Sequence, residues 1–437
     1  MDSIVRITGH THSLCILRTS LFICHTSTTD GISLCGIGSR PCKLEEMEIL
    51  PVTAHSDDRS TLATRQLSRR TGIKAVGIAG GLLAAGASFG PAIHAFAQDS
   101  TPDSTPVASP GAIPGIDPQN QEIIDALDAF KAPALETVTP DIGRNLPSFA
   151  DAEQAILAKR GDVSQEAVGA VEHLLIPGTG SDDDILARIY RPLKAGTGLL
   201  PVLVYFHGGG FVIANLDTYD ASCRALANAT GGIVASIAYR LAPEHPFPAA
   251  VDDAYNATQY FLAGAGVVGG DPAKVAVVGE SAGGNLATVV CLRARDEKGM
   301  MPLHQVLVYP VATFAPEGEA AVSVKKYADA KPLNSAQLMW FGMYYLADPA
   351  DVTNPYVSPL MANDLSGLPP ATIVQAEIDP LQSQGTAYAK ALEAAGVKVT
   401  RHLYKGTTHE FFGLGAVIDQ ANEAVDQVAK ELAAAFA

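Results

Sequence analysis

Short β-branched and apolar runs recur between residues 171 and 404, and helical patterns separate most of the later ones. The first two runs and the last partly alternate, whereas the middle runs are continuously apolar, as strands buried on both faces of a sheet must be. This alternation of strands and helices predicts an α/β fold with eight mostly parallel strands, of which the first two are a candidate hairpin. The runs are residues 171–176, 185–190, 202–206, 233–239, 275–278, 305–309, 372–376 and 398–404.

Two segments lie outside this alternation. Residues 118–165 have a helical pattern and precede the first strand, and residues 320–347 interrupt the chain between the sixth and seventh strands. We expect both to form layers over the carboxyl edge of the sheet, where the active sites of such sheets lie. The large side chains of the second segment fit either a substrate pocket or ordinary core packing. They are Tyr327, Leu338, Met339, Trp340, Phe341 and Tyr344.

The charge distribution excludes one class of partner. The formal net charge is −16, and residues 1–97 hold nine Lys/Arg and seven Asp/Glu, so the excess negative charge lies downstream of residue 97. Because no basic run is present to neutralise phosphates, we predict no nucleic-acid partner.

Residues 47–97 have the layout of an export signal. Arg69 and Arg70 precede an uncharged, Gly/Ala-rich run over residues 75–89. Small residues, Ala95 and Ala97, stand at positions −3 and −1 of a possible cleavage site after Ala97. The pattern resembles a twin-arginine signal, with Gly72 where that class usually has an aromatic residue. We therefore expect export to the periplasm or the medium and no stable membrane insertion after signal removal. A retained anchoring helix is the alternative, although the run is short for a membrane span.

The segments on either side of this signal carry no pattern of a packed core. Residues 1–46 contain four of the six cysteines at spacings that match no zinc site, and we interpret this segment as a non-native upstream extension, with translation starting at Met47. Residues 98–117 are rich in Ser, Thr and Pro, which predicts a disordered linker. Cys223 and Cys291 lie in apolar helical stretches, where we expect buried free thiols, a disulfide being the alternative.

A possible nucleophile stands where the fifth strand meets the next helix. Residues 275–285 read VAVVGESAGGN, and Gly279 to Gly283 fit the Gly-x-Ser-x-Gly elbow, in which small residues let the backbone turn sharply around the serine. An ordinary turn with Ser281 near a helix start is the alternative.

A serine nucleophile needs a histidine base, itself oriented by a carboxylate, and in elbow-type folds the order along the chain is Ser, acid, His. Asp379 follows the seventh strand and His409 follows the eighth. Each alone fits a helix cap or a surface loop, but together they occupy the required positions in the required order. His245 and His402 are weaker candidates, because one precedes Ser281 and the other lies inside the last strand.

A glycine-rich turn, HGGG over residues 207–210, follows the third strand. Its unobstructed N–H groups, with that of Ala282, fit an oxyanion hole, for which a plain turn is the alternative. Two other motifs are decoys. Residues 264–269 match Gly-x-Gly-x-x-Gly but lead from a helix into a strand, the reverse of a dinucleotide loop, and His409-Glu410 lacks the second histidine of a zinc helix. We predict no metal and no cofactor.

Taken together, these motifs resemble the hormone-sensitive lipase-like α/β-hydrolases. The matching stretches are HGGG at 207–210, YRLAPEHPFP at 239–248, GESAGG at 279–284, DPL at 379–381 and HEF at 409–411, and the resemblance spans about residues 130–437. It implies an α/β-hydrolase fold with a helical cap. The catalytic domain would span residues 166–437, and the cap would combine residues 118–165 with an insertion at about 320–347.

The resemblance also implies a function. It implies carboxylester hydrolysis by Ser281, Asp379 and His409 through an acyl-enzyme, with small short-chain esters as substrates. By the same match, Gly209, Gly210 and Ala282 supply the oxyanion hole. Two departures leave the subgroup open: Glu280 stands where the family often has Asp or Thr, and Gln382-Ser383 replaces the usual charged pair. The alternatives are a non-catalytic small-molecule receptor, such as the plant gibberellin receptors, which lack the catalytic histidine, and an amide hydrolase with the same triad.

Overall fold

The computed structural model describes residues 6–9, 12–17, 20–25, 114–162, 165–178 and 184–437. The chain divides into two compact units, Met1–Ser100 and Thr101–Ala437. The described part of the first unit is a three-stranded antiparallel sheet in the order β1-β2-β3, formed by β1 (Arg6–Gly9), β2 (His12–Leu17) and β3 (Ser20–His25). The predicted signal, 47–97, and residues 98–113 of the predicted linker lie outside the described residues, so both stay predictions.

The second unit contains the predicted eight-stranded sheet, in the order β11-β10-β9-β8-β6-β7-β5-β4. The candidate hairpin is confirmed, because β4 pairs antiparallel with β5 from Ala170↔Arg191 to Ile176↔Ile185. β5 is also antiparallel to β7, and the remaining neighbours are parallel. The strands are β4 (Ala170–Ile176), β5 (Ile185–Arg191), β6 (Leu200–Phe206), β7 (Ile233–Ile237), β8 (Gly270–Glu280), β9 (Gln305–Val308), β10 (Ala371–Ile378) and β11 (Val399–Thr408).

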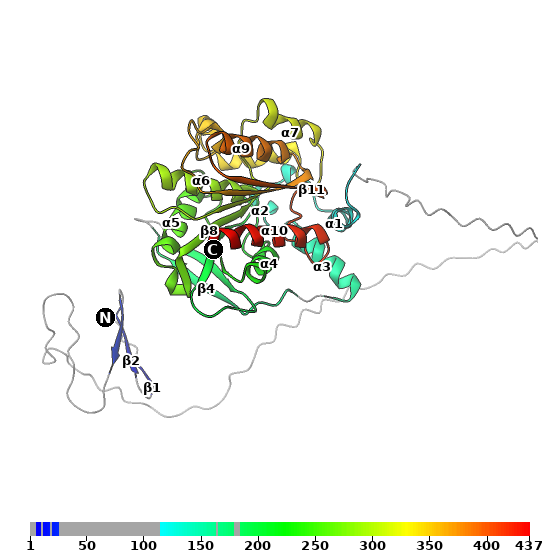
Figure 1. Cartoon of the computed structure of the whole chain (residues 1–437). Helices are drawn as coiled ribbons and strands as arrows, with labels where there is room; N and C mark the ends of the chain where they lie inside the picture. Colours follow the sequence, from blue (N-terminus) through cyan, green and yellow to red (C-terminus); the bar gives the residue numbers. More distant parts are fainter. Residues whose placement is uncertain (1–5, 10–11, 18–19, 26–113, 163–164, 179–183) are drawn as a thin grey trace, which may run out of the picture. The chain divides into compact units, whose positions relative to one another are not determined.

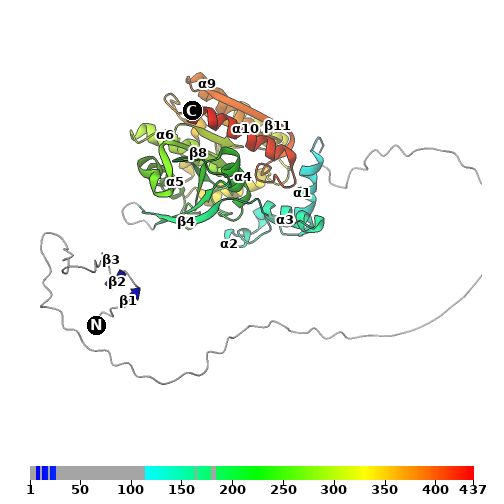
Figure 2. The same cartoon turned by 60° about the horizontal axis from the view of Figure 1, so that its bottom comes forward.

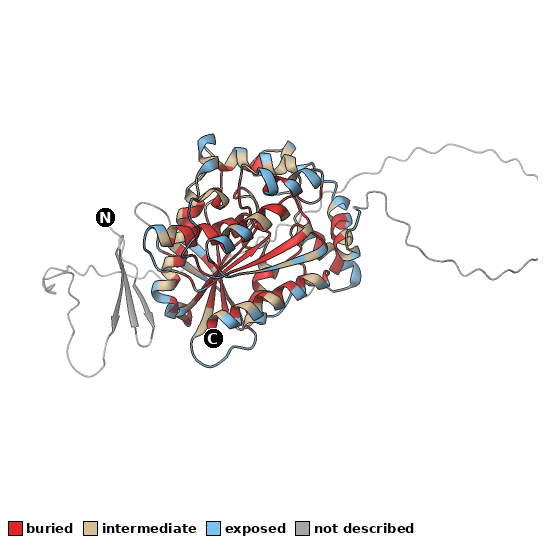
Figure 3. Ribbon diagram, turned by 45° about the horizontal axis from the view of Figure 1, so that its top comes forward, coloured by how far each residue is buried: buried red, intermediate tan, exposed pale blue. Residues whose placement is uncertain are grey.

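Helices cover both faces of this sheet, which explains why its central strands are apolar throughout (Figure 1). On β6, Val202 and Val204 belong to one hydrophobic cluster, whereas Leu203 and Tyr205 belong to the other. The first cluster includes residues of α5 (Ala249–Gly264), α6 (Ala282–Asp296) and α9 (Gln382–Ala394), and the second includes residues of α4 (Asp220–Thr230) and α10 (Asp419–Phe436). Figure 3 shows buried strands between helices that are buried mainly on one side.

The segment before the sheet forms three helices, each begun by residues suited to that place. They are α1 (Pro118–Ala129), α2 (Pro140–Gly143) and α3 (Phe149–Arg160), with the 3₁₀ turn η2 (Leu135–Thr137). The Asp117 side chain caps α1, which has Pro118 in its first turn, and Ser148 with Asp151 forms a capping box on α3. α1 packs against α3 and β11 (Figure 2).

The insertion between β9 and β10 forms η4 (Gly318–Ala321), α7 (Val322–Lys326) and α8 (Ser335–Tyr345), and η5 (Pro349–Thr353) and η6 (Pro359–Met361) follow. It contacts the N-terminal helical segment directly. Trp340 Nε1 donates to the carbonyl oxygen of Val138, and Lys331 Nζ lies 2.5 Å from Asp128 Oδ2. The two segments outside the strand–helix alternation therefore meet each other, and together we call them the cap.

The decoy motif at 264–269 ends α5 and forms the 3₁₀ turn η3 (Ala265–Val268), which leads into β8. Cys223 and Cys291 are free and buried, as predicted. Within the described ranges, no helix is long and apolar enough to span a membrane, and no group of three or more metal-ligating side chains is present.

Candidate active site

Ser281 occupies the turn between β8 and α6, and its backbone lies in a sparsely populated region, with φ 56° and ψ −114°. Two glycines permit this turn. A Cβ on Gly279 would lie 2.0 Å from the carbonyl oxygen of Gly283, and a Cβ on Gly283 would lie 1.9 Å from that of Phe206. The small residues of the motif are therefore required by close backbone contacts, and the turn has the geometry of a nucleophile elbow.

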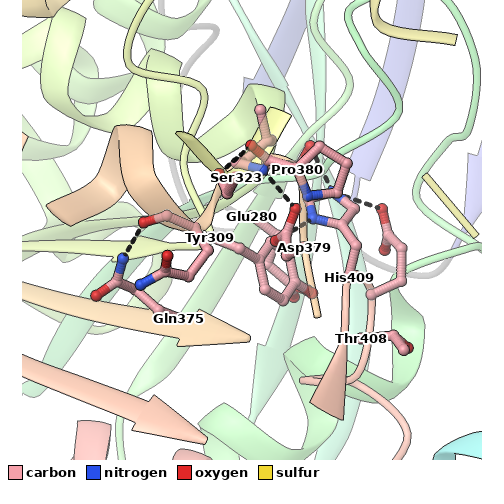
Figure 4. A network of polar contacts seen from close by, with 12 residues as sticks. Glu280, Tyr309, Ser323, Gln375, Asp379, Pro380, Thr408 and His409 are labelled. Carbon is pink, nitrogen blue, oxygen red and sulfur yellow. Dashed lines mark hydrogen bonds and ion pairs between the residues drawn. The ribbon is translucent and has the colours of Figure 1, made fainter. Parts of the chain in front are cut away.

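The structure brings the three predicted triad residues into one hydrogen-bonded chain. His409 Nε2 lies 3.0 Å from Ser281 Oγ, and His409 Nδ1 lies 2.8 Å from Asp379 Oδ2. Asp379 directly follows β10 and His409 directly follows β11, so both lie at the carboxyl edge of the sheet. The exposed fractions of Ser281, Asp379 and His409 are 6%, 0% and 3%. Figure 4 shows Asp379 pointing toward the ring of His409.

The weaker histidine candidates and the carboxylate of Glu377 are not part of this hydrogen-bonded chain. His402 lies within β11, with its Nε2 3.8 Å from Glu431 Oε1, and His245 lies between β7 and α5. Glu377 Oε2 accepts a hydrogen bond from the backbone N–H of Gly406. Glu377 therefore binds the backbone of the adjacent strand β11, whereas Asp379 contacts the imidazole of His409.

The electrostatic surroundings of His409 favour its protonated form. Burial by itself lowers the pKa of His409, but the nearby carboxylates Asp379, Glu410 and Glu280 raise it, and the net effect places it above its ordinary value. With Nδ1–H donating to Asp379, Nε2 is left to accept a proton from Ser281 Oγ.

The predicted oxyanion residues lie beside Ser281. Gly209 and Gly210 have φ values of 100° and 60°, and they line the same cavity as Ser281 and His409. A Cβ on Gly209 would lie 2.3 Å from the carbonyl oxygen of Ile213, and one on Gly210 would lie 2.1 Å from the Phe341 ring. Ala282 is the first residue of α6, where a backbone N–H has no partner within the helix. Their role as donors stays a prediction.

Glu280 is a component of the site that the sequence reasoning missed. Its carboxylate is buried and accepts hydrogen bonds from the hydroxyls of Tyr205 and Tyr309. Burial raises the pKa of Glu280 to about 7, although these hydroxyls lower it. The Tyr309 ring centroid lies 4.5 Å from that of His409, so the tyrosine that binds Glu280 packs against the imidazole (Figure 4).

Glu410 was also missed as a site residue. Both of its carboxylate oxygens lie 2.8 Å from the Tyr219 hydroxyl, which donates to them, and its Oε1 lies 3.8 Å from His409 Nε2. Burial raises the pKa of Glu410. Glu410 directly follows His409 in the sequence, and Glu280 directly precedes Ser281. Adjacency to a triad residue was therefore the one sequence signal for both. The tyrosine partners are Tyr205 of β6, Tyr219 directly before α4 and Tyr309 directly after β9, and no local pattern connects them.

Two cavities meet at Ser281. The larger, of about 710 Å³, is lined by α1, the residues around α2 and α3, and polar groups that include Tyr219, His409 and Glu410. The smaller, of about 630 Å³, is lined mainly by apolar residues of the insertion and of the segment after β9. Phe341 of α8 lines both. The apolar lining of the smaller cavity includes Val311, Phe314, Leu338, Met339, Met343, Leu346 and Leu381.

Comparison with known proteins identifies the family of this chain. The family described as alpha/beta hydrolase fold matches residues 203–413. Esterase LipI of Mycobacterium tuberculosis is 36% identical over 308 residues, which cover 68% of this chain and 94% of LipI. The chain belongs to the hormone-sensitive lipase-like α/β-hydrolase family.

Two further relatives and a solved structure are also similar to this chain. Ethyl acetate hydrolase of Pseudomonas putida is 38% identical over 56% of this chain and 77% of its own length. The carboxylic ester hydrolase LipN of Mycobacterium tuberculosis is 44% identical, and the match spans 65% of LipN. A solved esterase from Pyrobaculum calidifontis is 38% identical, with a TM-score of 0.65 over 74% of this chain and all of that one. The resemblance, the fold and the enzyme class inferred from the sequence agree with these relatives.

Proposed function

We propose that this protein is a serine carboxylesterase that hydrolyses short-chain acyl esters through an acyl-enzyme. The observation that carries the proposal is the hydrogen-bonded chain from Ser281 through His409 to Asp379, placed at a strained elbow where two cavities meet. The names of the relatives, which include a carboxylic ester hydrolase and an ethyl acetate hydrolase, support ester hydrolysis.

Acylation begins when His409 Nε2 accepts the proton of Ser281 Oγ and the oxygen attacks the ester carbonyl carbon. The carbonyl oxygen becomes an oxyanion, toward which the N–H groups of Gly209, Gly210 and Ala282 donate. The bond from the carbonyl carbon to the alcohol oxygen then breaks. His409 gives its proton to that oxygen, and the alcohol leaves.

Deacylation repeats these steps with water. His409 Nε2 accepts a proton from water, whose oxygen attacks the acyl carbon, and the bond to Ser281 Oγ breaks as His409 returns the proton to Oγ. The carboxylic acid is released and the enzyme is regenerated. Throughout, Asp379 holds the Nδ1–H tautomer and stabilises the imidazolium.

The acyl chain fits the smaller cavity, because its lining is mainly apolar and includes no charged side chain. Leu338, Met339 and Phe341 of α8 line it, whereas Trp340 packs inward against Val138 and Tyr344. The smaller cavity, of about 630 Å³, has room for acyl chains of about two to eight carbons, the short-chain range that the family resemblance implies. Longer acyl chains would extend beyond Met339 and Met343 into solvent, since these side chains have exposed fractions of 71% and 65%.

The alternatives fit less well. A receptor has no need of a base, yet His409 is hydrogen-bonded to both Ser281 and Asp379. An amide hydrolase would use the same triad, and what disfavours it is the names of the relatives.

Two measurements test the proposal. A series of p-nitrophenyl esters from acetate to dodecanoate is expected to give the highest kcat/KM at or below about eight carbons. A p-nitrophenyl alkylphosphonate is expected to stop turnover and to add its phosphonyl group to the peptide that contains Ser281, as found by mass spectrometry. Absence of hydrolysis together with absence of the adduct would refute a serine esterase, and an optimum at about twelve or more carbons would favour a lipase.

We also propose that the protein is exported by the twin-arginine route, on the basis of Arg69, Arg70 and the Gly/Ala-rich run that follows. Replacing both arginines by lysine is expected to retain the protein in the cytoplasm, and N-terminal sequencing of the exported form is expected to begin at or near Gln98. Unchanged export of the double variant would point to another route.

A further inference from the structure

Acidic side chains outnumber basic ones in the larger cavity beside Ser281. Seven Asp or Glu residues line it, against three Lys or Arg residues. Two of those three bases are already paired, because Lys331 Nζ lies 2.5 Å from Asp128 Oδ2 and Arg144 Nη2 lies 2.6 Å from Glu244 Oε2. Asp217 is paired with Arg188, at 2.7 Å, so the lining acids that no Lys or Arg of the described residues is shown to pair are Glu136, Asp151, Glu153, Glu280 and Glu410.

Glu153 of α3 is the most deeply buried acid of the cap in this cavity. Its exposed fraction is 4%, and its Oε1 has no hydrogen-bond partner in the described part of the chain. Glu136 lines the same cavity, and its Oε2 is also buried without a hydrogen-bond partner among the described residues. A buried carboxylate without a donor is costly, and such groups are normally paired. Burial accordingly raises the pKa of Glu153 to about 7, although a backbone hydrogen bond from Ala416 lowers it.

The position of the cavity indicates which part of an ester would meet these carboxylates. Its lining includes Ser281 and His409, so a bound group can reach the reacting atoms. The smaller cavity has an apolar lining suited to an acyl chain. The alcohol part of the ester is then left for the larger cavity, with Glu410 Oε1 3.8 Å from His409 Nε2, the atom that protonates the leaving oxygen.

We propose that the larger cavity binds an alcohol that carries a protonated amine, so that the enzyme favours acyl esters of amino alcohols. The ammonium group is stabilised by the negative charges of Glu153, Glu136 and Glu410. This inference rests on the proposed esterase function and adds a substrate class to it. The reaction remains hydrolysis: water is the co-reactant, and the products are a carboxylic acid and a protonated amino alcohol.

Two acetates of the same shape test the charge preference. 2-(Dimethylamino)ethyl acetate is protonated at neutral pH, and 3-methylbutyl acetate replaces its nitrogen by a carbon. We expect kcat/KM at pH 7 to be about tenfold higher for the amine ester, mainly through a lower KM, as electrostatic attraction to the nearby carboxylates provides. A parallel measurement uses the free alcohols as inhibitors of p-nitrophenyl acetate hydrolysis. 2-(Dimethylamino)ethanol is expected to inhibit at a lower concentration than 3-methylbutanol.

A matched pair of variants assigns the preference to Glu153. Glu153→Gln keeps the shape of the side chain and removes its charge, and it is expected to lower the amine-to-carbon efficiency ratio about tenfold. Glu393→Gln removes one charge from the exposed surface of α9 and is expected to leave the ratio unchanged. Circular dichroism checks that both variants fold. If Glu153→Gln does not fold, the alcohol inhibition of the wild-type enzyme still decides.

The outcomes separate this inference from the proposed function. If p-nitrophenyl acetate is not hydrolysed, the esterase function itself fails. If both acetates are hydrolysed with equal efficiency and both alcohols inhibit equally, only the amino-alcohol inference is overturned. A preference for 2-hydroxyethyl acetate over propyl acetate, without any preference for the amine, would replace it by a neutral polyol. A ratio that falls equally in Glu153→Gln and Glu393→Gln would show a long-range effect of net charge and would overturn the role of Glu153.

Discussion

The loops at the edge of the sheet and the cap are held in place by different forces. At the sheet edge, Ser281 sits in a strained turn that two glycines permit, and His409 and Asp379 are almost fully buried. The two segments of the cap are joined to each other partly by exposed contacts, such as the ion pair between Lys331 and Asp128. Surface ion pairs of this kind contribute only about 0–1 kcal/mol each. Changes in the sheet loops should therefore abolish chemistry, whereas changes in the cap should shift substrate preference by degrees.

The two regions meet next to the triad. Thr408, the residue before His409, donates its backbone N–H to the buried Asn120 side chain of α1. On the other side, Ser323 of α7 donates to the carbonyl oxygen of Pro380, the residue after Asp379, at 2.5 Å (Figure 4). Ser383, which stands where the family usually has a charge, lies 2.7 Å from Ser323 through their hydroxyls. Neutral hydrogen bonds therefore join the cap to the loop of the acid.

The largest effect is expected from Ser281→Ala, which removes the nucleophile. Loss of a triad serine lowers kcat by roughly 10⁶, and the variant should hydrolyse p-nitrophenyl acetate barely above background. Ser236→Ala is the matched control, because it removes another fully buried serine hydroxyl, from β7, and should keep near-normal turnover. Substantial activity in Ser281→Ala with an intact fold would require a different nucleophile.

Asp379→Asn should lower kcat by about 10⁴, because an amide selects the wrong tautomer of His409. Glu377→Gln, two residues earlier, should cost a few-fold at most. Its carboxylate contacts the backbone of Gly406, and a glutamine oxygen can accept the same hydrogen bond. Steady-state kinetics of the two variants side by side measure the difference, and equal losses would leave the acid unassigned.

A smaller effect, on chain length alone, is expected from the cap. Leu338→Trp fills part of the smaller cavity and should lower kcat/KM for p-nitrophenyl hexanoate about tenfold relative to the acetate, as a lost methylene-sized space does. Trp340→Phe, on the same helix, removes the hydrogen bond to Val138. It should cost about 1 kcal/mol of stability and leave the chain-length profile unchanged. A similar profile in both variants would mean that the insertion does not line the acyl site.

The sequence predicts the sheet-edge region better than the cap. The strands, the elbow and the order of Ser281, Asp379 and His409 could be predicted because each depends on local signals: apolar runs, glycines next to a serine, and polar residues directly after strands. Even there, the ends of some strands differ from the predicted ends. β8 extends over Gly270–Glu280 although only residues 275–278 show the apolar pattern, because pairing with β6 already begins at Gly270.

The surroundings of the triad could not be predicted in the same way. Glu280 reads as a surface-type residue, yet it is buried between tyrosines of β6 and the end of β9. Glu153 is one of two acids on α3, and although both line the larger cavity, Glu153 is buried whereas Asp151 is exposed. Such burial depends on contacts between distant segments, which have no signature in a single stretch of sequence.

The smallest expected effect is a shift in pH dependence, where a carboxylate facing the larger cavity acts on the triad. Only neutral His409 can accept the proton of Ser281, so kcat/KM should fall as the pH drops through the pKa of His409, which is raised above its ordinary value. Glu410 is one of the negative neighbours that raise this pKa. Glu410→Gln keeps an acceptor for the Tyr219 hydroxyl and removes the charge, so the acid limb of the profile should move to lower pH.

The direction of this shift distinguishes an electrostatic role from a structural one. A variant that merely loosened the site would lower kcat/KM at every pH and leave the position of the acid limb unchanged. Because burial also raises the pKa of Glu410 itself, its carboxylate is not fully ionised in the acid range, and the shift should be small. Glu393→Gln, which removes a distant surface charge, should leave the limb in place. Movement of the Glu410→Gln limb to higher pH would contradict the assignment, because removing a negative neighbour cannot stabilise the imidazolium.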